Sequence, residues 1–282
     1  MAAPGDPRER PIAVFDSGVG GLTVLHELLV QLPGEDYLYL GDTARFPYGS
    51  RSPDELVAFS MEIAEQLLAR RAKLLVVACN SATAAALPAL RERMRQTTLG
   101  VDVLGVVRPE AVQAVAATRN GRIGLLATPA TVDSGAYDEA VSAADAHVAL
   151  TSVAAPELAR LIQEGSEFDD EVVALVRGYV EPLREAGVDT VILGCTHYPL
   201  LRPMLQRLLG PEVQIVSSGS ALARQVQHAL GVSALANPRQ GEGEYRFLAT
   251  GDPEEFRRVG SRFLQLPLGP VEHVGLSREA AA

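Results

Sequence analysis

The chain has 282 residues, 47% of them hydrophobic, and a formal net charge of −10. This length and apolar content allow a sizeable core, in one large domain or two ordinary ones. The acidic balance argues against a nucleic-acid partner, and no apolar run reaches the roughly 18 residues of a membrane helix. The opening MAAPGDPRER also lacks the apolar centre of a signal peptide, so we expect a cytoplasmic protein without a membrane or nucleic-acid partner.

Short apolar runs alternate along the chain with segments of helical periodicity. Unpatterned, β-branched runs are typical of strands that are covered on both faces by helices. The predicted strands are residues 11–16, 36–42, 73–79, 101–107, 122–128, 147–153, 190–195 and 213–218. The predicted helices include residues 22–31, 54–70, 82–95, 169–186 and 220–230. This alternation predicts an α/β fold with mostly parallel sheets.

A weak internal repeat suggests two like halves. The stretches IAVFDSGVGGLTV (residues 12–24) and IGLLATPATVDSGAY (residues 123–137) both run from a strand through a turn of small polar residues into a helix. Each is followed downstream by a strand that ends in a cysteine, Cys79 or Cys195. Ligands of open α/β sheets bind at the carboxyl ends of the strands. Two such units facing each other would therefore place the two sulfur atoms across a cleft.

These two cysteines, the only ones in the chain, are the strongest candidates for reactive groups. Both are expected near helix N-termini, which favour the thiolate, and His197 lies two residues from Cys195, where it would assist further. A single buried cysteine usually only packs as a small hydrophobe, but two matched strand-end turns favour a function. A zinc site built from Cys79, Cys195 and His197 would lack the close ligand pairs of metal motifs, so no metal is expected.

Two further strand-end loops contain candidate ligand-binding groups. In DSGVGG, a threonine follows where the dinucleotide-binding pattern requires its last glycine, so nucleotide binding is poorly supported. Asp16 and Ser17 in this loop are better placed to face a ligand. In GDTARFPYGSRS, Tyr48 is either a hydrogen-bonding lid or a residue that packs the loop, and the pattern does not decide between them.

Four motifs, in their order and separation, resemble those of the bacterial glutamate racemases, cofactor-independent enzymes of the aspartate/glutamate racemase superfamily. They are DSGVGGLTV, GDTARFPYG, VVACNSAT and VILGCTHYPLL, and the similarity runs from about residue 11 to residue 256. His197 favours glutamate racemases over aspartate racemases, which tend to carry glutamate there. The resemblance implies interconversion of L- and D-glutamate by proton transfer between two cysteines, supplying D-glutamate for peptidoglycan synthesis. The single lysine, Lys73, precedes a strand, away from any such site, which fits a reaction without pyridoxal phosphate.

The resemblance also implies a role for each motif residue. Cys79 and Cys195 would exchange protons with opposite faces of the substrate α-carbon, Asp16 assisting the first and His197 the second. The implied substrate contacts are Asp16, Ser17, Tyr48, Gly49, Asn80, Ser81, Thr196 and His197. Relatives carry an auxiliary glutamate seven residues after a proline, whereas this chain has Gln163 after Pro156, with Glu164 next, and no role is assigned to either.

The family fold implies two similar α/β domains, related by a pseudo-twofold axis, with the active site in the cleft between them. The expected bounds are residues 9–103 plus 216–282 for the first domain and 104–215 for the second. We expect a small-molecule substrate, and a homodimer is one option for the oligomeric state. Two alternatives stay open: a racemase for aspartate or another amino acid, and a thiol redox or nucleotide-binding module.

Overall fold

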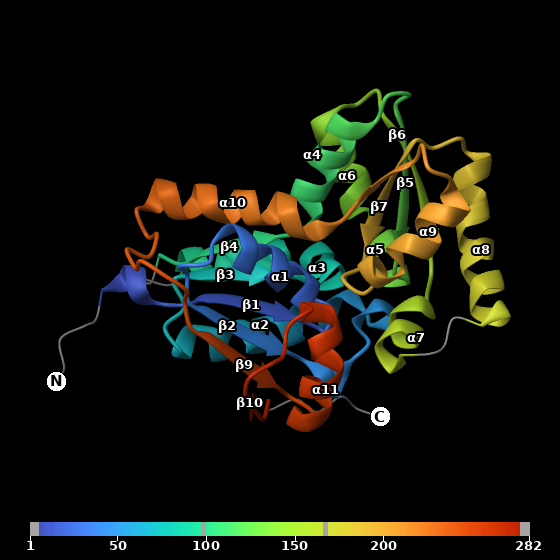
Figure 1. Cartoon of the computed structure of the whole chain (residues 1–282). Coiled ribbons are helices and arrows are strands. Elements are labelled where there is room, and N and C mark those ends of the chain that lie inside the picture. Colours follow the sequence, from blue (N-terminus) through green and yellow to red (C-terminus); the bar gives the residue numbers. More distant parts are fainter. Residues whose placement is uncertain (1–5, 97–99, 166–168, 277–282) are drawn as a thin grey trace.

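Two parallel sheets organise the chain (Figure 1). The computed structural model describes residues 6–96, 100–165 and 169–276, so the ends of the sequence considered above, residues 1–5 and 277–282, lie outside it. The first sheet has the strand order β10-β9-β2-β1-β3-β4 and the second β6-β5-β7-β8. Neighbouring strands pair in parallel in both sheets. The predicted α/β class with mostly parallel sheets is confirmed.

All the predicted strands are present, and the structure adds two more near the C-terminus. The first sheet contains β1 (Ile12–Asp16), β2 (Tyr37–Gly41), β3 (Leu74–Val77), β4 (Asp102–Gly105), β9 (Tyr245–Ala249) and β10 (Val271–His273). The second contains β5 (Arg122–Ala127), β6 (Ala149–Ala154), β7 (Thr190–Gly194) and β8 (Gln214–Val216).

Helices connect the strands and cover both faces of each sheet. The α-helices are α1 (Leu22–Gln31), α2 (Pro53–Ala69), α3 (Asn80–Gln96), α4 (Val107–Ala117), α5 (Pro129–Asp133), α6 (Ala136–Ala144), α7 (Leu158–Glu164), α8 (Asp170–Glu185), α9 (Arg202–Leu209), α10 (Ser218–Ser233) and α11 (Pro253–Leu264). The short 3₁₀ helices are η1 (Pro7–Glu9), η2 (Thr43–Arg45), η3 (Tyr48–Ser50) and η4 (Tyr198–Leu201). Within the described residues, no helix has the length and apolar character needed to cross a membrane.

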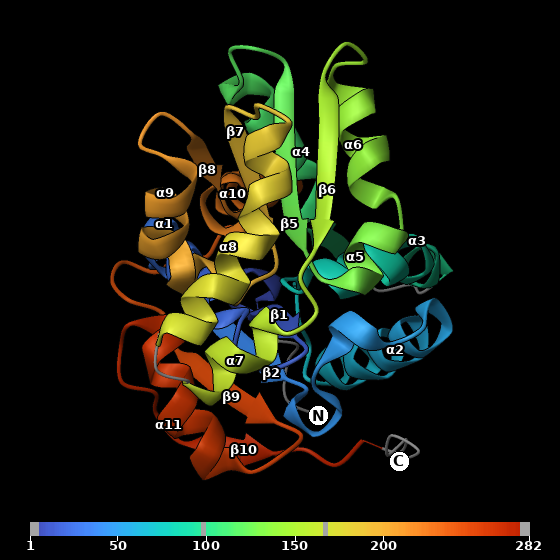
Figure 2. The same cartoon turned by 90° about the vertical axis from the view of Figure 1, so that its right-hand side faces the viewer.

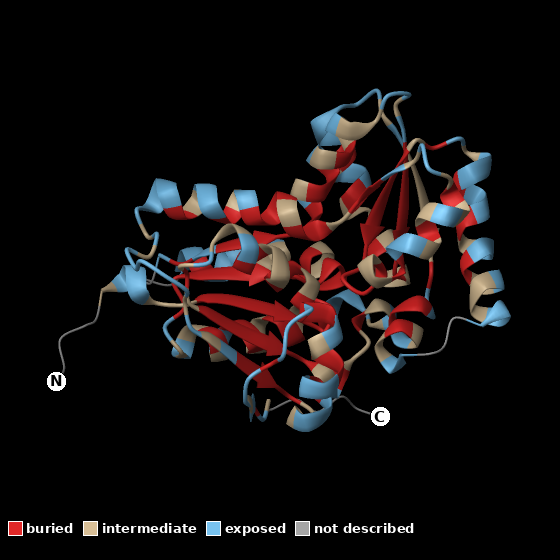
Figure 3. Cartoon of the chain, viewed as in Figure 1, coloured by how far each residue is buried: buried red, intermediate tan, exposed pale blue. Residues whose placement is uncertain are grey.

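Alternate residues of the strands enter different cores, as expected for strands covered on both faces. Ile12 and Val14 of β1 pack in a cluster with α1, α10 and α11, whereas Ala13 and Phe15 pack with α2 and α3. In the second sheet, Ile123 of β5 packs with α4 and α6. Figure 2 shows the helices on either side of the second sheet, and Figure 3 shows that the central strands of both sheets are buried.

The two sheets repeat one strand order. β1 lies between β2 and β3, with β4 beyond β3, and β5 lies between β6 and β7, with β8 beyond β7. The two halves of the weak sequence repeat therefore begin with the corresponding strands β1 and β5. The strands that lead to the cysteines, β3 and β7, are the corresponding neighbours of β1 and β5. The repeated order brings both cysteine turns to the carboxyl ends of their sheets.

The strands of the second sheet are consecutive in the chain, whereas those of the first come from both ends. β9 pairs with β2, with Tyr37 opposite Tyr245. Two strands end slightly beyond the expected domain boundaries. β4 ends at Gly105, two residues after residue 103, and β8 ends at Val216, one residue after residue 215. The exact domain bounds stay a prediction, and the strand allocation agrees with them.

Candidate active site

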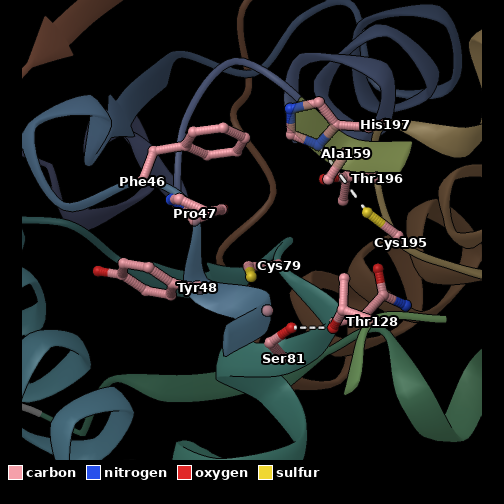
Figure 4. Close-up of a pocket in the computed structure, with 13 residues that line it drawn as sticks. Phe46, Pro47, Tyr48, Cys79, Ser81, Thr128, Ala159, Cys195, Thr196 and His197 are labelled. Atoms are coloured by element: carbon pink, nitrogen blue, oxygen red, sulfur yellow. Dashed lines mark hydrogen bonds between the residues drawn. The ribbon is translucent and has the colours of Figure 1, made fainter. Parts of the chain in front are cut away.

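A cavity lies between the carboxyl ends of the two sheets (Figure 4). It receives residues from the turns after β1 and β3 in the first sheet and after β5 and β7 in the second. Every site residue expected from the sequence lines it, except Asp16. The lining consists of Ser17, Phe46, Pro47, Tyr48, Gly49, Cys79, Asn80, Ser81, Thr128, Ala159, Cys195, Thr196 and His197. The strand-end argument therefore located the site, and the turns of both sheets build it.

Cys79 lies between the end of β3 and the start of α3. The backbone N–H of Ala82, in the first turn of α3, donates to the Cys79 sulfur at 3.5 Å. Burial raises the pKa of the thiol to about 12, and the nearby charge of Asp16 also raises it, whereas the Ala82 N–H lowers it. The helix N-terminus thus favours the thiolate, as expected, but burial outweighs it.

Cys195 follows β7, and His197 lies beside it. The chain continues into the 3₁₀ helix η4, which has Pro199 in its first turn, so a helix N-terminus lies close to Cys195 as expected; α9 begins later, at Arg202. The Cys195 sulfur lies 3.9 Å from Nδ1 of His197, and Nε2 of the same ring lies 3.0 Å from Oε1 of Gln163 in α7. The sequence assigned no role to Gln163, and the structure places it against the imidazole.

Burial sets the protonation of this second pair. It lowers the pKa of His197 to about 3 and raises the pKa of the Cys195 thiol. Since an amide oxygen can only accept, Nε2 of the neutral imidazole carries the hydrogen that it donates to Gln163, which leaves the Nδ1 lone pair toward the sulfur. The neutral imidazole therefore presents a hydrogen-bond acceptor to the Cys195 thiol.

Asp16 ends β1 and lies behind the cavity lining. Its Oδ1 accepts from the backbone N–H of Gly18 at 2.9 Å, and its Oδ2 accepts from the Thr196 hydroxyl at 3.1 Å. Burial raises its pKa to about 6, although these hydrogen bonds lower it. The carboxylate therefore joins the two sheets through Thr196 and contributes its charge to Cys79, and the structure does not bring it to the cavity surface.

The loop after β2 places Tyr48 and Gly49 in the lining. The Tyr48 hydroxyl donates to the buried carboxylate of Asp42, and its ring lies 5.6 Å from that of Phe59. Figure 4 shows this hydroxyl pointing away from the cavity. Of the two interpretations left open, the structure favours packing over a hydrogen-bonding lid. A Cβ atom at Gly49 would lie 2.6 Å from Cβ of Thr128, so glycine permits the close approach of the two halves here.

Asn80 and Ser81 open α3 and face the second half of the chain. The Asn80 amide nitrogen donates to Oε2 of Glu110 at 3.0 Å and to the Tyr137 hydroxyl at 2.7 Å. Its Oδ1 is buried and has no hydrogen-bond partner within the described part of the chain. The Ser81 hydroxyl lies 2.8 Å from that of Thr128. Both side chains thus connect the cysteine turn of the first sheet to groups of the second half.

The glycines of DSGVGG have a packing explanation. A Cβ atom at Gly20 would lie 2.4 Å from both Nδ1 of His197 and the Thr196 hydroxyl oxygen. Only glycine lets the turn after β1 approach the turn after β7 so closely. This close approach explains why residue 20 is a glycine without any need for a bound phosphate.

Lys73 lies at the opposite edge of the first sheet, as predicted. It precedes β3, and its ammonium group pairs with the buried Glu35 and donates to the backbone carbonyl of Arg8. The single lysine therefore makes a buried ion pair at the amino ends of the strands, away from the cavity.

Comparison with known proteins identifies the family. The family model described as Asp/Glu/Hydantoin racemase matches residues 21–226. The chain is 46% identical to the glutamate racemase of Geobacter metallireducens over 271 residues, 96% of this chain and 98% of that protein. It is 45% identical to that of Mycobacterium tuberculosis over 269 residues, 95% of this chain and 97% of the relative. The fold matches a glutamate racemase isoform of Bacillus anthracis with a TM-score of 0.89 and 38% identity, covering 95% of this chain and 98% of the other.

The chain belongs to the glutamate racemase family.

A family structure with a bound ligand is also similar. The glutamate racemase from Francisella tularensis, solved in complex with D-glutamate, matches with a TM-score of 0.88 and 30% identity, covering 96% of this chain and 99% of that one. The expected resemblance to glutamate racemases is confirmed over nearly the whole chain, which favours this family over the redox and nucleotide-binding alternatives.

The sequence missed four lining residues of this glutamate racemase family member: Phe46, Pro47, Thr128 and Ala159. Phe46 and Pro47 stand in the GDTARFPYG motif beside Tyr48, and Thr128 directly follows β5, as Ser17 follows β1. Both positions could have been chosen by the strand-end argument. Ala159 lies in α7, and an alanine in a helix gives no signal of a site.

Proposed function

We propose that this chain interconverts L- and D-glutamate by moving the α-hydrogen between Cys79 and Cys195, without a cofactor. One observation carries the proposal: two free thiols, each just beyond a strand of a different sheet, line one cavity. A racemase without a cofactor requires a proton acceptor and a proton donor on opposite faces of the α-carbon. The family membership supplies glutamate as the substrate.

The proposed step balances as follows. The Cys79 thiolate removes the α-hydrogen as a proton, and the electron pair of the broken C–H bond stays on the carbon. The Cys195 thiol then delivers its proton to the opposite face, forming the new C–H bond. Cys79 ends as the thiol and Cys195 as the thiolate, which is the state that starts the reverse direction.

Substrate binding supplies the charge that a thiolate needs. Burial raises the pKa of both thiols in the ligand-free site, and the ammonium group of glutamate brings a positive charge, which lowers the pKa of a nearby thiol. Asp16, with a pKa of about 6, is mostly ionised at neutral pH and keeps Cys79 a strong base. The first N–H groups of α3, at Asn80 and Ser81, have no partner within the helix and are suited to bind a carboxylate.

Deuterated water tests the two-thiol mechanism. Starting from L-glutamate, the sulfur on the product side has equilibrated with solvent, so D-glutamate should carry deuterium at the α-carbon from the first turnover. The remaining L-glutamate should stay almost unlabelled early, because its abstracted proton returns to the face that it left. The reaction is stopped at low conversion, and each enantiomer is analysed by mass spectrometry from both starting enantiomers.

Unlabelled product, or equal label in product and recovered substrate, would contradict the proposal. Cys79→Ser and Cys195→Ser serve as controls, and each should slow racemisation by about 10² to 10⁴ or more while leaving the circular dichroism spectrum unchanged.

Three broader predictions accompany this function: a cytoplasmic location, D-glutamate supply to peptidoglycan synthesis, and a homodimer as one option. Light scattering of the purified protein measures the last.

A further inference from the structure

Glu110 is a buried acid for which the proposed mechanism has no use. It lies in the first turn of α4, its exposed fraction is 0%, and α4 packs against α3, α6 and α10 (Figure 1). Burial raises its pKa to about 8, against smaller opposing effects of Ser218, Tyr137 and Asn80. The acid is therefore mostly neutral at pH 7, which explains how it is tolerated in a dry interior. Such a residue is costly to keep unless its hydrogen bonds serve a purpose.

Glu110, Tyr137 and Asn80 are hydrogen-bonded to one another, Glu110 through its Oε2. Oε2 of Glu110 accepts from the Tyr137 hydroxyl and, at 3.0 Å, from the Asn80 amide nitrogen. The same nitrogen donates its other hydrogen to the Tyr137 oxygen at 2.7 Å. We place the proton of the neutral acid on Oε1, which has no hydrogen-bond partner among the described residues, so that Oε2 only accepts. Because a hydroxyl has one hydrogen and Oε2 takes it, Tyr137 can only accept from Asn80.

This arrangement fixes the orientation of the Asn80 amide. If the amide were reversed, Oδ1 would lie against the Tyr137 oxygen with no hydrogen between them. In the observed orientation both amide hydrogens are used, so Oδ1 points away from Glu110 and Tyr137. Asn80 lines the cavity, and its Oδ1 is buried without a partner among the described residues. An unpartnered acceptor at this place is suited to a ligand that donates hydrogens, and the substrate's donor is its ammonium group.

We propose that Glu110 is a positioning residue: by engaging the hydrogen of Tyr137, it holds the Asn80 amide with Oδ1 toward the cavity, where Oδ1 accepts from the substrate ammonium. The inference rests on the proposed function and adds a residue outside the four recognised motifs. It also gives a specific role to Asn80, which was expected only as a substrate contact: its amide hydrogens are both engaged and are not free for a substrate carboxylate.

The test compares glutamate with glutarate, which has the same two carboxylates and no ammonium group. In Glu110→Leu the Tyr137 hydrogen is released and can pair with Oδ1, so the amide is free to reverse. The ratio of glutamate KM to glutarate inhibition constant should rise about 10- to 100-fold, as for a lost hydrogen bond to a charged group. The kcat should change less than the KM, in both directions.

Glu110→Gln is the conservative variant. Its amide oxygen still accepts from Tyr137 and Asn80, so the ratio should stay within about threefold of the native value. Tyr137→Phe removes one acceptor of the Asn80 hydrogens and should raise the ratio about 3- to 10-fold, which keeps the test decisive if Glu110→Leu does not fold. Glu139→Leu, the same change at an exposed position of α6, should leave the ratio unaltered.

An unchanged ratio in folded Glu110→Leu or in Tyr137→Phe would overturn the inference. So would an equal rise in Glu110→Gln and Glu110→Leu, since only the second removes the acceptor. Failure of the wild type to racemise glutamate would instead overturn the proposed function. Calorimetry of glutamate and glutarate binding to the wild type measures recognition of the ammonium group without requiring racemisation, so it separates failure of the inference from failure of the proposed function.

Discussion

The His197 ring beside Cys195 is neutral for two reasons. Burial lowers its pKa to about 3, and Gln163 accepts the Nε2 hydrogen at 3.0 Å without adding a negative charge. A carboxylate at this position would stabilise the imidazolium, whereas an amide does not. The ring of this protein is therefore neutral over the whole physiological range, with its Nδ1 lone pair 3.9 Å from the Cys195 sulfur.

Gln163→Glu should convert this histidine into a titrating group. The added carboxylate accepts the same hydrogen and favours the charged ring, so the pKa of His197 should rise toward the neutral range. Nuclear magnetic resonance titration of the ring protons, with His197→Asn to assign the signal, measures it. In the wild type the His197 signal should not move above pH 5, and in Gln163→Glu it should. Identical titration curves for the two proteins would show that the charge of residue 163 does not control the imidazole.

At the scale of elements, the sequence predicted strands well where burial is complete on both faces. The segments that became β1 to β8 are short runs of β-branched and apolar residues, and helix α1 (Leu22–Gln31) has the predicted bounds. β9 has a similar composition, at Tyr245–Ala249, and could have been found. β10, Val271–His273, could not have been found, because two of its three residues are exposed and it is recognised as a strand only by its pairing with β9.

The turns between elements were harder to predict than the strands that they follow. The sequence placed Asp16 at a strand end and therefore facing a ligand, but the close approach of Thr196 covers it. The direction of the Tyr48 hydroxyl depends on Asp42, six residues earlier in the chain, whose burial no local pattern reveals. A contact between the two halves decides the first case and a buried contact within the first half decides the second, and no local sequence pattern contains either.

The turn from β1 to α1 should not tolerate any side chain at residue 20. In Gly20→Ala the new Cβ atom would lie 2.4 Å from both Nδ1 of His197 and the Thr196 hydroxyl oxygen, so the turn after β1 and the cysteine turn after β7 must move apart. Because displacements of about 1 Å can cost 10²-fold in rate, we expect a loss of at least that order in kcat/KM. Steady-state racemisation assays measure the loss.

Gly231→Ala in α10 is the matched control, since a Cβ atom there has no neighbour within 4 Å. It should keep full activity and gain about 0.5–1 kcal/mol of stability, as alanine is the better helix former. Native activity in Gly20→Ala would mean that the site tolerates a wider separation of the turns than its geometry implies.

At the scale of the whole molecule, buried ionisable groups tie stability to pH. Glu110 has an ordinary pKa of 4.5, which folding raises to about 8. The folded state therefore holds this proton more tightly than the unfolded state. Its contribution to stability is complete below pH 4.5 and is lost as the pH rises to 8. His197 acts in the opposite sense, since its lowered pKa costs stability as the pH falls below its ordinary value of 6.5.

Glu110→Gln should isolate the first effect, because the variant retains His197 and Asp16 and lacks the titrating carboxyl. Relative to this variant, the wild type should lose up to about 1.4 kcal/mol of unfolding free energy for each unit of pH between 5 and 8. Urea unfolding of both proteins across this range gives the difference. A difference that does not vary with pH would indicate that Glu110 titrates alike in the folded and unfolded chains.

The order of strands has a consequence for synthesis on the ribosome. Strands β5 to β8 leave the ribosome one after another, so the second sheet can close while translation continues. The first sheet cannot, because β2 waits for β9, whose residues emerge about 200 positions later. Until then β2 is an edge strand with unpaired backbone groups. A chain terminated after α10 would hold both cysteine turns and yet leave this edge bare, ready to pair with a strand of another nascent chain.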